Sequence, residues 1–205
     1  AASDVYKRQV QTNLLVEGFY TILDDVFALR DMDDAADGGK VKERYNGSGA
    51  TVRGFNVEGR AAFTRWFELQ AGVTLQQSRY KEPEFWSEDA EVPPVRRMFR
   101  TPDAYGYFTA SFKPVRNFTA DLSGTCTGSM LVQHMAGSGV AQDVAVSTPS
   151  FFDMNIRLSY DVRIYKEITM QLYGGVQNLF NAYQKDFDKG VDRDSGYIYL
   201  SLIHI

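Results

Sequence analysis

The amino-acid sequence predicts an all-β fold of antiparallel strands that are long enough to cross a membrane. Apolar and polar residues alternate along several long segments, so each segment has one apolar and one hydrophilic face. A tilted membrane strand needs about 9–11 residues, whereas strands of soluble sheets usually have about five or six. Long and short connections alternate, as in outer-membrane barrels. We therefore predict a transmembrane β-barrel fragment of about eight strands.

Three strands are predicted in the first 80 residues. The first covers residues 14–29, although Leu15 and Phe19 interrupt its alternation. Residues 31–46 are rich in aspartate and glycine and are predicted to form a solvated loop. The next two strands cover residues 51–63 and 66–80. Because only two residues separate them, a tight hairpin is expected.

A second hairpin is predicted between two long loops. Residues 81–101 contain three prolines and are therefore not expected to form a central strand. Residues 104–112 and 118–132 then alternate regularly on either side of a turn that contains Pro114. Residues 133–149 form the loop that follows.

The third predicted hairpin joins residues 152–163 to residues 168–176 and shows a clean period of two on both sides of its turn. A charged loop at residues 182–194 follows it. Residues 195–199 are predicted to begin one more strand.

The alternation assigns side chains to two faces of a curved wall. Apolar side chains are expected on the convex side toward lipid, and polar side chains on the concave side toward an aqueous interior. The expected convex set in the central strands is Leu122, Cys126, Ile156 and Leu158, and the concave set is Asp121, Ser123 and Arg157.

Aromatic residues gather beside the three short turns, where a membrane interface would place an aromatic belt. They are Phe63, Trp66, Phe67, Phe112, Phe118, Tyr160 and Tyr165. A soluble sandwich with aromatic side chains closing its hairpin ends is the alternative. The length of the strands and their apolar outward faces favour the barrel.

Composition narrows the possible functions. The net charge of −4 gives no electrostatic basis for binding nucleic acid. Cys126 is the only cysteine, so no intrachain disulfide can form. No cofactor motif is present, because Gly137 and Gly139 lack the strand-to-helix setting of a phosphate loop. Residues 1–9 and 200–205 are interpreted as adapter-derived artefacts, which leaves residues 10–199 as the barrel segment.

The segment GGVQNLFNAYQKDFDKGVDRDSGYIY at residues 174–199 resembles the C-terminal signature of TonB-dependent outer-membrane receptors. LVEGFYTILDDVF at residues 15–27 and YNGSGATVRGFNVE at residues 45–58 resemble the barrel pattern of that family. The resemblance implies a barrel of about 22 strands filled by an N-terminal plug, of which this chain supplies about the last eight. It implies an outer-membrane location and active uptake of a scarce ligand, such as an iron–siderophore complex or cobalamin. Outer-membrane lipid and, through the absent plug, the TonB complex are the implied partners.

The outer loops supply the candidate ligand-binding residues, which are Phe85, Trp86, Arg96, Arg97, Arg100 and His134. The arginines could bind an anionic ligand such as a metal chelate. Pairing with the acidic residues Glu82, Glu84, Glu88, Asp89 and Glu91 of the same loop is the favoured alternative. Phe85 and Trp86 could form an aromatic shelf for a ligand, or could hold the loop in place.

Neither catalysis nor metal binding is expected. His134 is the only histidine outside the excluded ends, and loop packing or ligand contact is the expected role. The loop DFDKGVDRD resembles a calcium loop, but Gly190 and Tyr197 occupy its fifth and twelfth positions, where an EF-hand has other residues. Asp186, Asp188, Asp192 and Asp194 are instead expected to pair with Lys185, Lys189 and Arg193.

Two other functions are compatible with the pattern. One is a passive porin or a non-transporting outer-membrane barrel, which would lack a plug. The other is a soluble ligand-binding barrel of the lipocalin kind.

Overall fold

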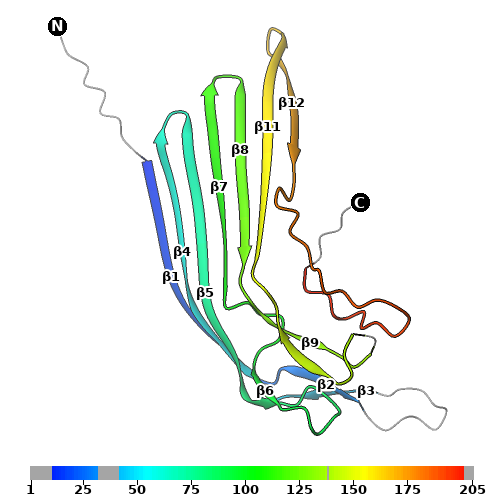
Figure 1. Cartoon of the computed structure of the whole chain (residues 1–205). Helices are drawn as coiled ribbons and strands as arrows, with labels where there is room; N and C mark the ends of the chain where they lie inside the picture. Colours follow the sequence, from blue (N-terminus) through cyan, green and yellow to red (C-terminus); the bar gives the residue numbers. More distant parts are fainter. Residues whose placement is uncertain (1–10, 32–41, 138, 201–205) are drawn as a thin grey trace.

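The computed structural model describes residues 11–31, 42–137 and 139–200 and contains only strands, turns and loops in these ranges (Figure 1). The strands of the main sheet are β1 (Gln11–Leu23), β4 (Ala50–Thr64), β5 (Phe67–Glu84), β6 (Val95–Arg97), β7 (Ala104–Val115), β8 (Phe118–Thr127), β11 (Phe151–Tyr165) and β12 (Ile168–Val176). Two small sheets consist of β2 (Phe27–Asp31) with β3 (Lys42–Asn46), and of β9 (Leu131–His134) with β10 (Val144–Ser147).

The main sheet is antiparallel throughout, as predicted. Its strands lie in the order β1-β4-β5-β7-β8-β11-β12, and β6 pairs with β5 beside this path. Each strand in this order pairs with the next main-sheet strand in sequence, so the sheet is a meander. Within the described residues the sheet is open, with β1 and β12 at its two edges (Figure 1).

The register aligns like residues across the sheet and confirms the two predicted faces. Leu122 of β8 lies opposite Ala110 on one side and Ile156 on the other. The next residue, Asp121, lies opposite Ser111 and Arg157. Because paired residues of a sheet share a face, the apolar and polar positions form continuous rows on opposite faces.

Polar side chains bond to one another across the strands. Ser111 Oγ donates to Asp121 Oδ1 at 2.6 Å, and Thr74 Oγ1 donates to Asn56 Oδ1 at 2.8 Å. Gln171 Nε2 donates to Asp161 Oδ1 at 2.9 Å. These bonds align the strands without a hydrophobic core on this face.

The three hairpin turns lie together at one end of the sheet, and the longer connections lie at the other (Figure 1). Four of the seven aromatic residues predicted beside the turns contact one another at the turn end. Phe67 stacks on Phe63 and Phe112 with ring centroids 5.5 and 4.7 Å apart, and Trp66 is 6.1 Å from Phe67. These side chains therefore join the first two hairpins.

The first predicted strand, residues 14–29, is divided in the structure. β1 ends at Leu23, and Asp25 adopts a positive φ of 52°. Such a conformation interrupts the regular strand, and aspartate tolerates it better than most residues. The chain then forms β2, whose partner β3 lies within the stretch predicted to be a loop. Residues 32–41 of that loop lie outside the described residues.

The other long connections also contain more strand than predicted. β5 continues through Pro83 to Glu84, where β6 pairs with it at Arg79 and Glu84 only, so the missing N–H of Pro83 breaks no regular ladder. The predicted strand at residues 118–132 ends at Thr127, and Leu131 begins β9 of a separate hairpin.

Residues 195–199 do not form the predicted strand. Both tyrosine hydroxyls of this segment donate to Asp186, which holds the segment against its own loop. Residues 1–9 and 201–205, which the sequence predicted to be foreign, fall outside the described residues; Leu200 is described.

Candidate functional site

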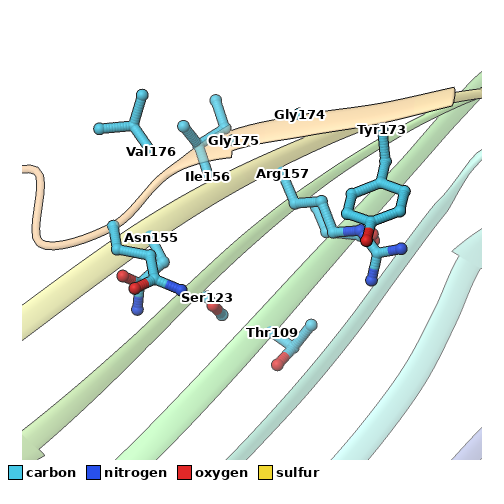
Figure 2. Close-up of a pocket in the computed structure, with 11 residues that line it drawn as sticks. Thr109, Ser123, Asn155, Ile156, Arg157, Tyr173, Gly174, Gly175 and Val176 are labelled. Atoms are coloured by element: carbon cyan, nitrogen blue, oxygen red, sulfur yellow. The ribbon is translucent and has the colours of Figure 1, made fainter.

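The polar face of the sheet contains a hollow of about 830 Å³ where β7, β8, β11 and β12 meet. Figure 2 shows Arg157, Tyr173, Ser123 and Thr109 on the hollow's side of the strands. Ile156 and Val176 point away from these four. The alternation of β8 and β11 thus presents polar side chains to the hollow, as the sequence predicted for Asp121 and Ser123 of β8 and for Arg157 of β11.

Both charges and neutral hydrogen-bonding groups line this hollow. The guanidinium carbon of Arg157 lies 4.8 Å from the centre of the Tyr173 ring, close enough for a cation–π interaction. Asn155 donates to Asp153 at 3.1 Å and accepts from the Asn178 N–H at 2.9 Å. Asp153 itself does not line the hollow, and its second carboxylate oxygen is buried with no donor among the described residues. The hollow is therefore suited to a polar, hydrogen-bonding occupant.

At the end of the sheet away from the hairpin turns, His134 holds the long connections together. Its Nε2 lies 2.9 and 3.0 Å from the two carboxylate oxygens of Asp188, and the two side chains are only 8% and 4% exposed. The imidazole stacks on the Tyr197 ring at 3.7 Å with an interplanar angle of 5°. The His134 side chain is thus enclosed between a carboxylate and an aromatic ring.

The acidic groups of residues 186–194 are satisfied mainly by hydrogen bonds within the connections. The hydrogen bond from His134 lowers the pKa of Asp188. Partial burial opposes ionisation of Asp186, but hydrogen bonds from Tyr197 and Tyr199 lower its pKa overall. Asp194 accepts from the Met135 N–H at 2.9 Å. Asp186 and Asp188 are thus held by hydrogen bonds from His134, Tyr197 and Tyr199.

Two of the candidate arginines make contacts between connections. Arg97 forms an ion pair with Asp103 at 2.9 Å and donates to the Ser129 carbonyl at 2.7 Å. Arg100 donates to the carbonyls of Ile198 at 2.9 Å and Gly196 at 2.5 Å. Neither contact is with the acidic residues of the same loop, which the sequence had favoured as partners. Arg96 is exposed in the middle of β6.

Phe85 and Trp86 lie beside a smaller hollow of about 280 Å³ that Tyr80 and Phe99 also line. Trp86 packs edge-on against Phe99 with centroids 5.4 Å apart, whereas the Phe85 side chain is 75% exposed. Trp86 therefore holds the loop, and Phe85 remains available. The structure thus places Phe85 and Trp86 at one hollow but sets His134 and Arg100 in a separate group of contacts.

Sequence reasoning missed the partners of His134 and Asp186, because these partners, Asp188, Tyr197 and Tyr199, lie in an irregular segment without periodicity. The spacing of Tyr197 and Tyr199 gave one signal, since two tyrosines two residues apart in an extended segment share a side. No group of three or more metal-ligating side chains occurs among the described residues. Over the same residues, no helix is long and apolar enough to span a membrane.

No family model and no curated protein matches the chain. Solved structures do resemble it. The ferric-catecholate import receptor Fiu of E. coli K12, in its closed form, aligns with a TM-score of 0.56 and 18% identity over 87% of this chain and 22% of its own. A mutant of the ferric enterobactin receptor PfeA of Pseudomonas aeruginosa aligns with a TM-score of 0.53 and 15% identity over 82% of this chain and 23% of its own.

At these identities the similarity shows the fold alone. The chain has the fold of an open segment of a β-barrel, and it spans less than a quarter of the length of either solved receptor. Both structural neighbours are named as receptors for ferric ligands.

Proposed function

We propose that this chain is part of the wall and outer loops of an outer-membrane receptor that takes up a scarce ligand actively, in the manner of TonB-dependent receptors. The observation that carries the proposal is a two-faced meander whose long connections and short turns lie at opposite ends. One face is a continuous apolar row for lipid, the other lines a polar hollow, and the long connections collect at one end. The two solved receptors that share this arrangement support it.

The ligand class proposed is a metal chelate of the iron–siderophore type, with cobalamin as the second choice. The first class is supported by the names of the two structural neighbours, which are a ferric-catecholate import receptor and a ferric enterobactin receptor. Phe85 and Arg96 are exposed at the long-connection end and would be available to such a ligand. Arg97, Arg100, Trp86 and His134 would shape that end through the contacts described above.

The polar hollow is proposed to face a plug domain supplied by the rest of the polypeptide. Its occupant would need hydrogen-bonding groups of its own, because Asp121, Ser123 and Arg157 line the hollow. TonB would act through that plug, and outer-membrane lipid would cover the apolar face.

Uptake by the complete protein tests the proposal. Iron-starved cells that express the full gene in a host without its own ferric-chelate receptors should accumulate ⁵⁵Fe from a ferric catecholate. Accumulation should stop when TonB is deleted or the proton gradient is collapsed. Iron uptake that continues without TonB would contradict active transport.

A passive porin is the second candidate, because the same two-faced sheet would also line an open channel. Conductance of the complete protein in planar bilayers separates the two. A plugged receptor should show little conductance, whereas a porin should show a steady open channel.

A further inference from the structure

Arg79 and Arg97 lie directly opposite each other where β6 pairs with β5. Like charges in this position repel and destabilise the pairing of two strands. Asp103 neutralises Arg97 in part, through the ion pair at 2.9 Å. Arg79 is exposed and forms no ion pair with another described residue. The pair therefore retains an excess of positive charge that an external anion would relieve.

A third guanidinium lies beside this pair. Arg53 of β4 donates to Gln77 Oε1 through Nε at 3.2 Å and through Nη2 at 2.7 Å. The register places Arg53 opposite Gln77 and Thr51 opposite Arg79, so all three arginines lie on one face. A hollow of about 310 Å³ is lined by Arg79, Arg97 and Gln77, together with Gln76, Ser78 and the Asp103 that pairs with Arg97. Within it, Nε of Arg97 is buried and has no acceptor among the described residues.

The face that carries these arginines is the apolar one. Along β5 the outward side chains run from Phe67 through Val73 to Leu75, and Gln77 and Arg79 follow in the same row. The apolar part covers about 26 Å of strand, or roughly 20 Å of height when the strand is tilted, which is most of an apolar band about 25 Å tall. The outward row of β4 changes from apolar to cationic at the same level, because Phe55 pairs with Leu75 and Arg53 pairs with Gln77.

We propose that Arg53, Arg79 and Arg97 form a binding site for the phosphate of an anionic lipid headgroup, on the outer surface of the wall just beyond the apolar band. Guanidinium groups bind phosphate through paired N–H donors. The change from apolar to cationic residues at one level selects a lipid headgroup over a free anion, because only a lipid brings its phosphate to that height. The inference rests on the proposed membrane placement of the sheet.

Lipid titration of the complete, detergent-solubilised protein tests the site. Short-chain phosphatidylglycerol should bind the natural protein, and Arg79→Gln should weaken binding about tenfold through loss of a charge-assisted contact. Arg79→Lys should retain most of the affinity. Arg60→Gln is the matched control, because it removes the same charge from the opposite face, where Arg60 pairs with Glu68 at 2.5 Å.

Native mass spectrometry can count bound lipid, and thermal unfolding can verify that each variant is folded. Equal binding by the natural protein and Arg79→Gln would overturn the proposal. Competition by inorganic phosphate at the same concentration as lipid would also overturn it, since the site would then serve a soluble anion. Loss of iron uptake with intact lipid binding would count against the transport function alone.

Discussion

His134 and Asp188, which are 54 residues apart in sequence, meet through two contacts of 2.9 and 3.0 Å in a position where both side chains are almost completely buried. The Tyr197 ring covers the imidazole at 3.7 Å. This pair ties the β9–β10 hairpin to the connection that follows β12. The long connections at that end are therefore joined by specific contacts.

Replacing His134 by alanine should loosen the connection at residues 182–194. The variant loses the stacked ring and leaves the buried Asp188 with only the Asp194 N–H as donor, so local opening becomes more frequent. Limited proteolysis of the complete protein should cut this connection about fivefold faster or more. The control is Lys166→Ala in the β11–β12 turn at the other end of the sheet. This variant should be cleaved at the same rate as the natural protein. Unchanged cleavage of the His134 variant would show that the pair does not hold the connection.

The same contact should depend on pH through Asp188. The hydrogen bond from His134 lowers the pKa of Asp188 in the folded protein, so its contribution is complete above the usual carboxyl pKa of about 3.9. That contribution should disappear as pH falls through the lowered pKa. Proteolysis by an acid-stable protease should therefore accelerate in this acidic range. In Asp188→Asn the acidic increase should be smaller, and an equal increase in both proteins would contradict this assignment.

Gly124 and Gly174 should respond differently to a side chain. A Cβ on Gly124 would approach Phe108 Cε1 at 2.4 Å and the Asp153 carbonyl oxygen at 3.2 Å, whereas a Cβ on Gly174 would meet no atom within 4 Å. Gly124→Ala should therefore destabilise the sheet by about 1–3 kcal/mol through overpacking. Gly174→Ala should cost little. Equilibrium unfolding of the complete protein in lipid with urea measures both, and equal midpoints would refute the close fit of Phe108 over Gly124.

Leu122 and Ser123 test the assignment of the two faces, because they are adjacent residues of β8 with opposite directions. Arginine at the lipid-facing position should cost about 2–4 kcal/mol at the middle of the membrane, whereas a position facing the aqueous interior should tolerate it better. Ser123→Arg is therefore the matched control for Leu122→Arg. The fraction of heat-modifiable, membrane-inserted protein reports the difference. A larger loss for Ser123→Arg would reverse the two faces.

The sequence predicted most of the main sheet. Alternation of period two placed Leu122 and Asp121 on opposite faces and gave the three hairpins, because the pattern depends only on local backbone geometry and burial. It also predicted the aromatic cluster around Phe67 and the polar lining of the hollow. The boundaries were less accurate: β2, β3, β6, β9 and β10 lie in or beside segments that were predicted to be loops or parts of longer strands.

The sequence by itself thus determined the two-faced sheet, and only the tertiary structure decided which side chains meet at its ends. Nothing local connects Arg79 with Arg97 or His134 with Asp188, since irregular connections carry no period that links their residues. Their partners follow from where neighbouring strands end and from which buried polar groups must find a hydrogen bond there.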